Sequence, residues 1–113
     1  MSDTDKIRSL NDRHRTGDHT VPGQTMVTRG LVALLEDTQT APEDLMHLVR
    51  TYDDFTPDND PHAEHDFGSF EFQGHQCFWK FDYYAPDLKL GSDDPSCPKK
   101  TMRVLTVMLA EEY

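Results

Sequence analysis

The densest group of side chains able to do chemistry lies between residues 58 and 66. It comprises Asp58, Asp60, His62, Glu64, His65 and Asp66. Carboxylates and imidazoles this close together can hold a transition metal, which accepts mixed nitrogen and oxygen ligands. The spacing fits neither an EF-hand loop nor the H-E-x-x-H and H-x-x-E-H motifs. A solvated acidic loop explains the same residues, so we expect no metal site. The alternative is a metal-dependent enzyme or sensor centred on His62, Glu64, His65 and Asp66.

Nucleophilic catalysis has no better support. Cys77 falls at an inward position of a predicted strand, where cysteine behaves as a small buried hydrophobe. Cys97 has no histidine near it in the sequence, and there is no glycine-rich phosphate loop. We therefore expect no catalytic residue, no cofactor and no enzymatic activity. Two cysteines at ordinary spacing are typical of free thiols in a reducing compartment.

Almost all of the net charge lies in one segment. The chain of 113 residues has 21 acidic side chains against 11 Lys and Arg, a net charge of −10. Residues 36–66 hold ten acids and one base, Arg50, which gives −9. The ten are Glu36, Asp37, Glu43, Asp44, Asp53, Asp54, Asp58, Asp60, Glu64 and Asp66. DNA has one charge per ~1.7 Å of axis and an extended chain rises ~3.3 Å per residue. This segment is therefore expected to approach, without equalling, the charge density of a duplex.

A surface with charge of one sign predicts the chemistry of its partner. The natural partner is the basic nucleic-acid cleft of another protein, reached by electrostatic steering. A pI near 4.8 argues against direct binding to nucleic acid or to an anionic membrane. We include all ten acids in the partner-binding set, together with Phe78 and Tyr84 as aromatic anchors. Because loop charges seldom hold a core together, we expect Asp53, Asp54, Asp58 and Asp60 to be replaceable without loss of the fold.

Localisation and self-association follow from the same composition. No apolar run approaches the ~18–20 residues that span a bilayer, and the first five residues do not resemble a signal peptide. We expect a cytoplasmic protein with no membrane contact. Its charge disfavours self-association, while an unpaired sheet edge would permit it, so a monomer or small homo-oligomer is expected.

Two helices are predicted in the first half of the chain. Residues 4–15 have a thin apolar stripe. Residues 40–43 form a capping-box pattern, followed by Leu45, Leu48, Val49 and Tyr52 at the spacing of an amphipathic helix. Residues 25–35 predict a strand leading into a short turn, because Gly30 weakens a helix, with a helix as the alternative. Residues 54–66 predict a long acidic loop.

The second half predicts strands. Residues 69–84 alternate as a hairpin that turns at Gln73-Gly74 or Gly74-His75 and places Trp79 in the core. Residues 85–100 predict a loop. Residues 102–110 predict a strand buried on both faces, with a short helix as the alternative. The expected fold is a single α+β domain, residues 1–113. In it a small antiparallel sheet, formed by the hairpin, the C-terminal strand and residues 25–34, packs against one or two helices.

Several strings together resemble one known family. They are YDDFTPDNDPHAEHDFG at residues 52–68, FWKFDYY at 78–84, GSDDP at 91–95 and RVLTVMLA at 103–110, with Thr28-Arg29-Gly30 and Asn11-Asp12 in support. From about residue 10 to 113 the chain resembles the bacterial domain of unknown function 3768, a family of small uncharacterised acidic proteins. The resemblance supplies no mechanism. Its members occur on bacterial chromosomes and mobile elements, which implies a role in genetic conflict.

These observations predict a DNA-mimicking inhibitor of a bacterial defence complex, of the anti-CRISPR or antirestriction type. The other hypotheses are the metal-dependent protein described above and a non-catalytic adaptor between proteins.

Overall fold

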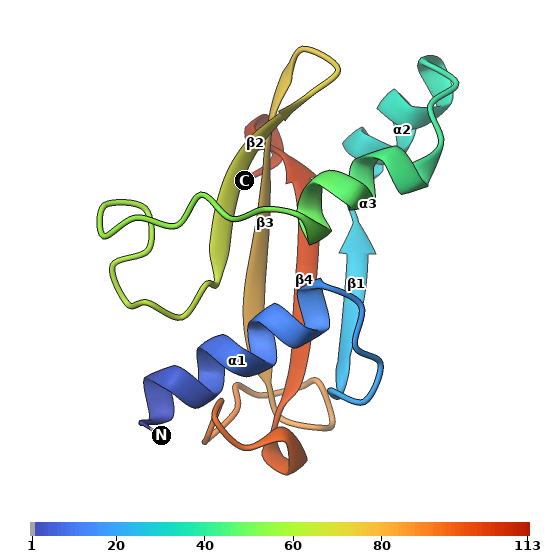
Figure 1. Ribbon diagram of the computed structural model, residues 1–113. Coiled ribbons are helices and arrows are strands. Elements are labelled where there is room, and N and C mark those ends of the chain that lie inside the picture. Colours follow the sequence, from blue (N-terminus) through green and yellow to red (C-terminus); the bar gives the residue numbers. More distant parts are fainter. Residues whose placement is uncertain (1) are drawn as a thin grey trace.

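The structure is a computed structural model that describes residues 2–113 (Figure 1). It confirms the predicted α+β class. The helices are α1 (Asp3–Arg15), α2 (Arg29–Asp37) and α3 (Pro42–Arg50), with short 3₁₀ helices η1 (Pro98–Lys100) and η2 (Ala110–Glu112). The strands are β1 (Gly23–Val27), β2 (Phe67–Phe72), β3 (His75–Tyr84) and β4 (Met102–Leu109).

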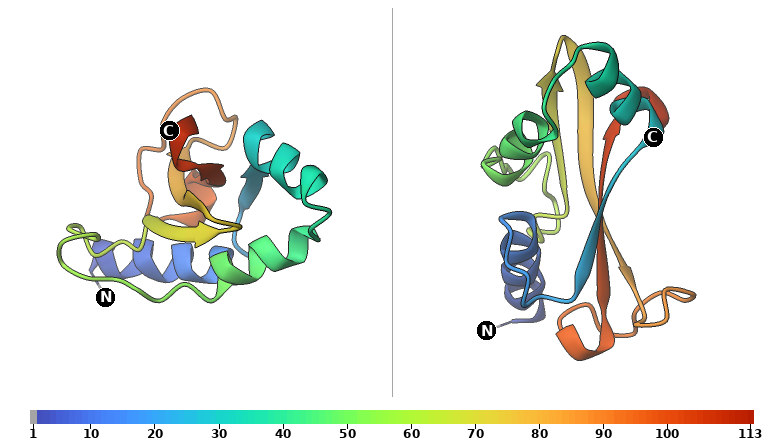
Figure 2. Two further views of the ribbon diagram at one scale, coloured as in Figure 1. Left: turned by 90° about the horizontal axis from the view of Figure 1, so that it is seen from above. Right: turned by 90° about the vertical axis from the view of Figure 1, so that its right-hand side faces the viewer.

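The four strands form one mixed sheet in the order β1-β4-β3-β2. β3 is antiparallel to both of its neighbours, whereas β1 runs parallel to β4. The expected antiparallel sheet is therefore wrong at the β1 edge. A parallel neighbour requires a long connection, and the chain between Val27 and Met102 supplies it. In Figure 2, α1 and α3 lie on one face of the sheet, and within residues 2–113 no α-helix covers the middle of the other face.

The hairpin has the register that its sequence pattern predicts. Phe72 pairs with His75 across Gln73 and Gly74, which have φ angles of 53° and 77°. Two left-handed residues in a two-residue loop match the right-handed twist of the strands. The turn places Phe70 and Phe72 on the same face as Cys77, Trp79 and Phe81, towards the helices.

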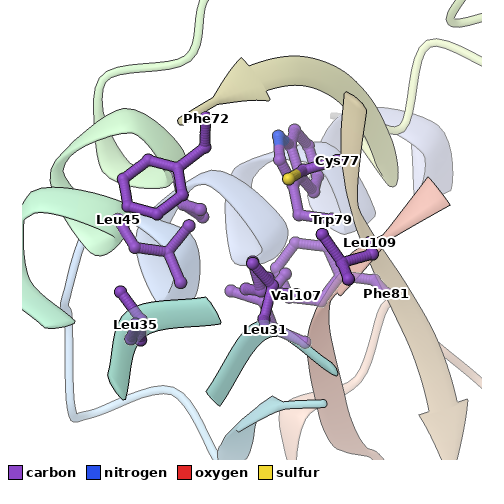
Figure 3. Packing of buried hydrophobic residues seen from close by; sticks show 11 residues of the cluster. Leu31, Leu35, Leu45, Phe72, Cys77, Trp79, Phe81, Val107 and Leu109 are labelled. Carbon is purple, nitrogen blue, oxygen red and sulfur yellow. The ribbon is translucent and has the colours of Figure 1, made fainter. Parts of the chain in front are cut away.

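The core lies between this face and the helices (Figure 3). Leu31 and Leu35 from α2, and Leu45 and Val49 from α3, pack against the buried side chains of β3 and β4. Trp79 is completely buried. Its indole lies so close to Gly68 on β2 that a Cβ there would come within 2.3 Å of Nε1. β4 is buried on both faces as predicted, because Val104 and Met108 on its outer side are also shielded.

Residues 29–37 form a helix, where the sequence pattern predicted the end of a strand and a turn. The Glu112 carboxylate, more than 80 residues away, accepts hydrogen bonds from the Gly30 N–H (2.9 Å) and the Thr28 hydroxyl. It supplies negative charge at the N-terminus of α2, where the helix dipole favours it. A Cβ at Gly30 would lie 2.7 Å from this carboxylate, so the glycine that argues against a helix in the sequence makes room for the cap.

Two details of α3 also differ from prediction. The N-cap is Ala41, with no side-chain cap, and Pro42 occupies the first turn. The Thr40 hydroxyl instead forms a hydrogen bond with the Thr38 hydroxyl and accepts one from the side-chain amide of Gln73 in the hairpin. The predicted capping box therefore does not form. Leu48 was expected in the buried stripe, but it is 37% exposed because the helix contacts the core mainly through Leu45 and Val49.

Replacing Trp79 by alanine tests the position of the core. We expect Trp79→Ala to lower the free energy of unfolding by about 3–5 kcal/mol, because it removes a fully buried aromatic side chain and leaves a cavity. Leu90→Ala is the control, since Leu90 is 71% exposed, and it should change stability by less than about 0.5 kcal/mol. Urea denaturation measures both, and equal stabilities would contradict the assigned core.

Candidate functional site

The acidic segment divides into carboxylates that face water and carboxylates that fold back onto the protein. Seven are exposed, and we call them the acidic band: Glu36, Asp37, Glu43, Asp44, Asp53, Asp54 and Asp58. Asp60 is only 8% exposed, while Glu64 and Asp66 are half-buried. The prediction that all ten acids form one binding surface is therefore wrong for Asp60, and Glu64 and Asp66 are only partly accessible.

The band follows three consecutive parts of the chain, the last turn of α2, the first turn of α3 and the segment after α3 (Figure 1). Glu43 and Asp44 have a structural explanation, because acidic side chains stabilise the N-terminal turn of a helix. Glu43 also forms an ion pair with Arg50 near the end of the same helix. These two carboxylates contribute to helix α3 whether or not a partner binds.

Glu36 and Asp37 have no such explanation. They lie in the last turn of α2, where the helix dipole disfavours negative charge by about 0.3–1 kcal/mol per residue. That turn contains no basic residue. Within the described part of the chain, neither carboxylate forms a salt bridge. The fold would be more stable with these charges absent.

The spacing of the band is wider than that of phosphates in DNA. Six of the seven carboxylates come in pairs of neighbouring residues. Most of helix α3, which is about 14 Å long, lies between the pair Glu43 and Asp44 and the pair Asp53 and Asp54. A duplex carries one charge per ~1.7 Å over the same length. The expected near-duplex density is therefore too high. The band offers a few negative contact points held in fixed positions.

The segment after α3 is held in place by His65. Its Nδ1 lies 2.8 Å from Asp12 Oδ1 on α1, and its Nε2 lies 3.7 Å from Asp60 Oδ2. The His65 ring stacks on Phe55 with centroids 3.6 Å apart, and its backbone N–H donates to Asp60 Oδ1. Asp60 is thus part of the support of this loop, and in place of the expectation that it can be replaced freely we expect its replacement to destabilise the loop.

The start of the same segment is held by Arg15 of α1, whose side chain is buried. Its Nη1 donates to the carbonyl oxygens of Val49 (2.8 Å) and Tyr52 (3.1 Å), and its Nη2 donates to Asp12 (3.2 Å). The guanidinium lies 5.0 Å from the ring centre of Trp79. A cation at this position satisfies carbonyl groups at the C-terminus of α3 and complements its dipole.

A second buried arginine contacts α1 one turn before Arg15, at Asn11. Arg103 is fully buried on β4; its Nε donates to Asn11 Oδ1 (2.8 Å) and its Nη2 to the Pro95 carbonyl. Asn11 donates to the Tyr83 hydroxyl (2.8 Å), which donates to Glu64 Oε1 (3.0 Å). Burial lowers the pKa of Arg103 and raises the pKa of Tyr83 well above its usual range. Glu64 therefore acts as an anchor for this network.

Sequence reasoning missed Arg15, Asn11 and Arg103. The only local signal is Arg103, a charged residue inside an otherwise apolar strand. An isolated charge in such a strand implies a buried partner, but its identity depends on contacts with α1 about 90 residues earlier in the chain.

The residues of the metal hypothesis do not converge. His62 is exposed, Glu64 contacts Tyr83, and His65 contacts Asp12. Burial raises the pKa of Asp66, which favours its neutral form. Among residues 2–113 no group of three or more His, Cys, Asp or Glu side chains is arranged to hold a metal ion. The geometry gives this alternative no support.

Phe78 and Tyr84 lie on the face of the sheet opposite the helices. The Phe78 ring packs 5.0 Å from Phe67 and 5.8 Å from Tyr113, so it is already half-covered within the chain. These aromatics therefore lie on the opposite side of the sheet from α3. Cys77 is buried, Cys97 is half-buried and both are free thiols.

Comparison with known proteins identifies the family. Residues 27–112 match the profile described as a protein of unknown function, DUF3768. The chain belongs to the DUF3768 family. The profile begins at residue 27, later than the resemblance proposed from about residue 10, so Asn11, Asp12 and Arg15 of this DUF3768 protein lie outside the match. Searches of curated proteins and of solved structures gave no match. In residues 2–113, no helix has the length and apolar character needed to cross a membrane.

Arg15 provides a test of how the site is supported. We expect Arg15→Ala to lower the free energy of unfolding by about 2–4 kcal/mol, because it leaves carbonyl groups at the end of α3 without a donor. Arg13→Ala is the matched control in the same helix, since Arg13 forms a solvent-exposed ion pair with Asp18, worth less than about 1 kcal/mol. Denaturant unfolding measures both variants. Equal small losses would mean that Arg15 does not anchor the acidic segment.

Proposed function

We propose that this DUF3768 protein is a non-catalytic inhibitor that occupies the basic nucleic-acid cleft of a bacterial defence complex in the cytoplasm. A CRISPR effector complex or a restriction enzyme is the proposed target, and the action is mimicry of DNA. The observation that carries the proposal is the acidic band. It comprises seven exposed carboxylates on or next to helices whose positions are fixed by buried contacts.

Fixed positions matter because a disordered acidic tail would lose conformational entropy on binding. Arg15 and His65 hold the two ends of the segment that contains Asp53, Asp54 and Asp58. Carboxylates held in this way keep their spacing before the partner arrives. Opposite charge on the partner then accelerates encounter and fixes the orientation of the two proteins.

The placement of Glu36 and Asp37 also supports a binding role. Their charges oppose the dipole of α2 and have no compensating partner in residues 2–113. Local choices that reduce stability without a visible structural gain are characteristic of functional positions. Lys and Arg side chains that normally contact phosphates would supply the missing partners.

The wide spacing of the band limits the form of mimicry. A few carboxylates would occupy only the strongest cation sites of a cleft and would block DNA by excluding it from them. Like charge should prevent this protein from binding DNA itself. Screening over ~8 Å near physiological ionic strength should weaken the inhibition as salt is raised.

Charge reversal in the segment after α3 tests the proposal. The triple variant Asp53→Lys, Asp54→Lys, Asp58→Lys should lose inhibition of DNA binding while keeping the fold, because these three side chains are exposed. Its control reverses Glu71, Asp93 and Glu111 to lysine. These side chains are equally exposed but lie outside the band, and both variants change the net charge by the same amount. Gel-shift competition with purified CRISPR effector complexes and restriction enzymes, at two salt concentrations, measures inhibition.

The control variant should inhibit as the wild type does, and wild-type inhibition should fall at the higher salt concentration. An equal loss of inhibition in the two variants would show that overall charge, and not the band, is responsible. Failure of the wild type to block any of these complexes would contradict the proposed function and favour a role as an adaptor between proteins.

A further inference from the structure

An apolar pocket opens between α2 and α3, next to the end of β1. It has a volume of about 300 Å³ and is lined by Val27, Val32, Leu35, Glu36, Thr40, Pro42, Leu45 and Met46. Leu35 and Leu45 are buried members of the core and form the floor of the pocket. Val32, by contrast, is 40% exposed at the pocket, which leaves apolar surface in contact with water.

The charged side chains at the rim of this pocket are mostly acidic. Glu36 is part of its wall, and Asp37 is the next residue along α2. Glu43 and Asp44 directly follow Pro42, another wall residue, in the first turn of α3. No Lys or Arg lines the pocket. These four carboxylates of the acidic band and the pocket therefore form one surface with an apolar floor and a negative rim.

The dimensions favour a side chain as the occupant. A volume of about 300 Å³ is at the lower limit of small-ligand sites. Strong protein interfaces commonly have this arrangement, in which one apolar anchor enters a pocket and polar groups surround it. A second copy of this chain would bring two negative rims together, so self-association through this surface is disfavoured.

We propose that the pocket binds one apolar side chain of the partner, from a segment with Lys or Arg on both sides of it. This inference rests on the proposed function, and it adds a source of specificity that charge alone does not provide. The basic side chains pair with Glu36, Asp37 and Asp44, while the apolar side chain covers Val32 and the floor of the pocket. A partner surface with basic residues alone would leave the pocket unfilled.

Two synthetic peptides test this inference. They share the same Lys and Arg residues and differ at one central position, which is leucine in one peptide and alanine in the other. At low salt the leucine peptide should bind about tenfold or more tightly, because its extra methylene and methyl groups are buried. Calorimetry measures both affinities, and NMR shifts of the Val32 and Leu35 methyl groups locate the bound peptide.

A matched pair of variants assigns the effect to the pocket. Val32→Gln places a polar side chain at the pocket and should remove the preference for leucine. Leu48→Gln makes the same change at a residue of similar exposure, 37% against 40%, that does not line the pocket, and it should leave the preference intact. Circular dichroism checks that both variants fold.

The possible outcomes separate this inference from the proposed function. Equal binding of the two peptides would overturn the pocket inference and leave the charge-based function standing. Binding of neither peptide would count against both. Concentration-dependent self-association that disappears in Val32→Gln would overturn the inference in favour of a second copy of the chain as the occupant.

Discussion

The guanidinium of Arg15 joins the three parts of the molecule on which the candidate site depends. It projects from α1, donates hydrogen bonds to carbonyl groups at the end of α3, and lies over Trp79 of the central sheet. Its carboxylate neighbour, Asp12, also binds His65. Through these contacts the segment after α3 is attached to α1 near both of its ends. The sixteen residues 51–66, which form no helix or strand, therefore keep a defined course, although many of their side chains face water.

The ten acids of the segment have different physical roles. Asp60 and Glu64 accept hydrogen bonds from groups that hold the loop to the rest of the fold. Glu43 and Asp44 stabilise the start of α3. Glu36 and Asp37 oppose the dipole of α2, while Asp53, Asp54 and Asp58 are exposed beyond α3. Net charge alone cannot separate these groups. Asp66 is half-buried. Of the exposed carboxylates, only Glu36, Asp37, Asp53, Asp54 and Asp58 lack a structural explanation, and they are the strongest candidates for contact with a partner.

Local sequence patterns predicted the elements whose determinants are local. The hairpin follows from the alternation on both sides of Gln73-Gly74, and β4 follows from a short run of apolar residues. Helix α2 was missed because the side chain that caps its N-terminus belongs to Glu112, and no pattern within residues 28–37 contains that carboxylate. The same reason applies to the site. The sequence identifies every acid of the band, but the burial of Asp60 depends on His65, and the position of His65 depends on Asp12.

The most direct test of whether the band binds a partner is to measure stability and inhibition together in one variant, Glu36→Lys with Asp37→Lys. Reversal should increase the free energy of unfolding by about 1–2 kcal/mol, because lysine at the end of α2 complements the helix dipole. The same variant should lose the ability to block DNA binding by the target. A more stable protein that no longer inhibits would show that these charges are retained for binding at a cost to the fold. Full inhibition by the stabilised variant would contradict that conclusion.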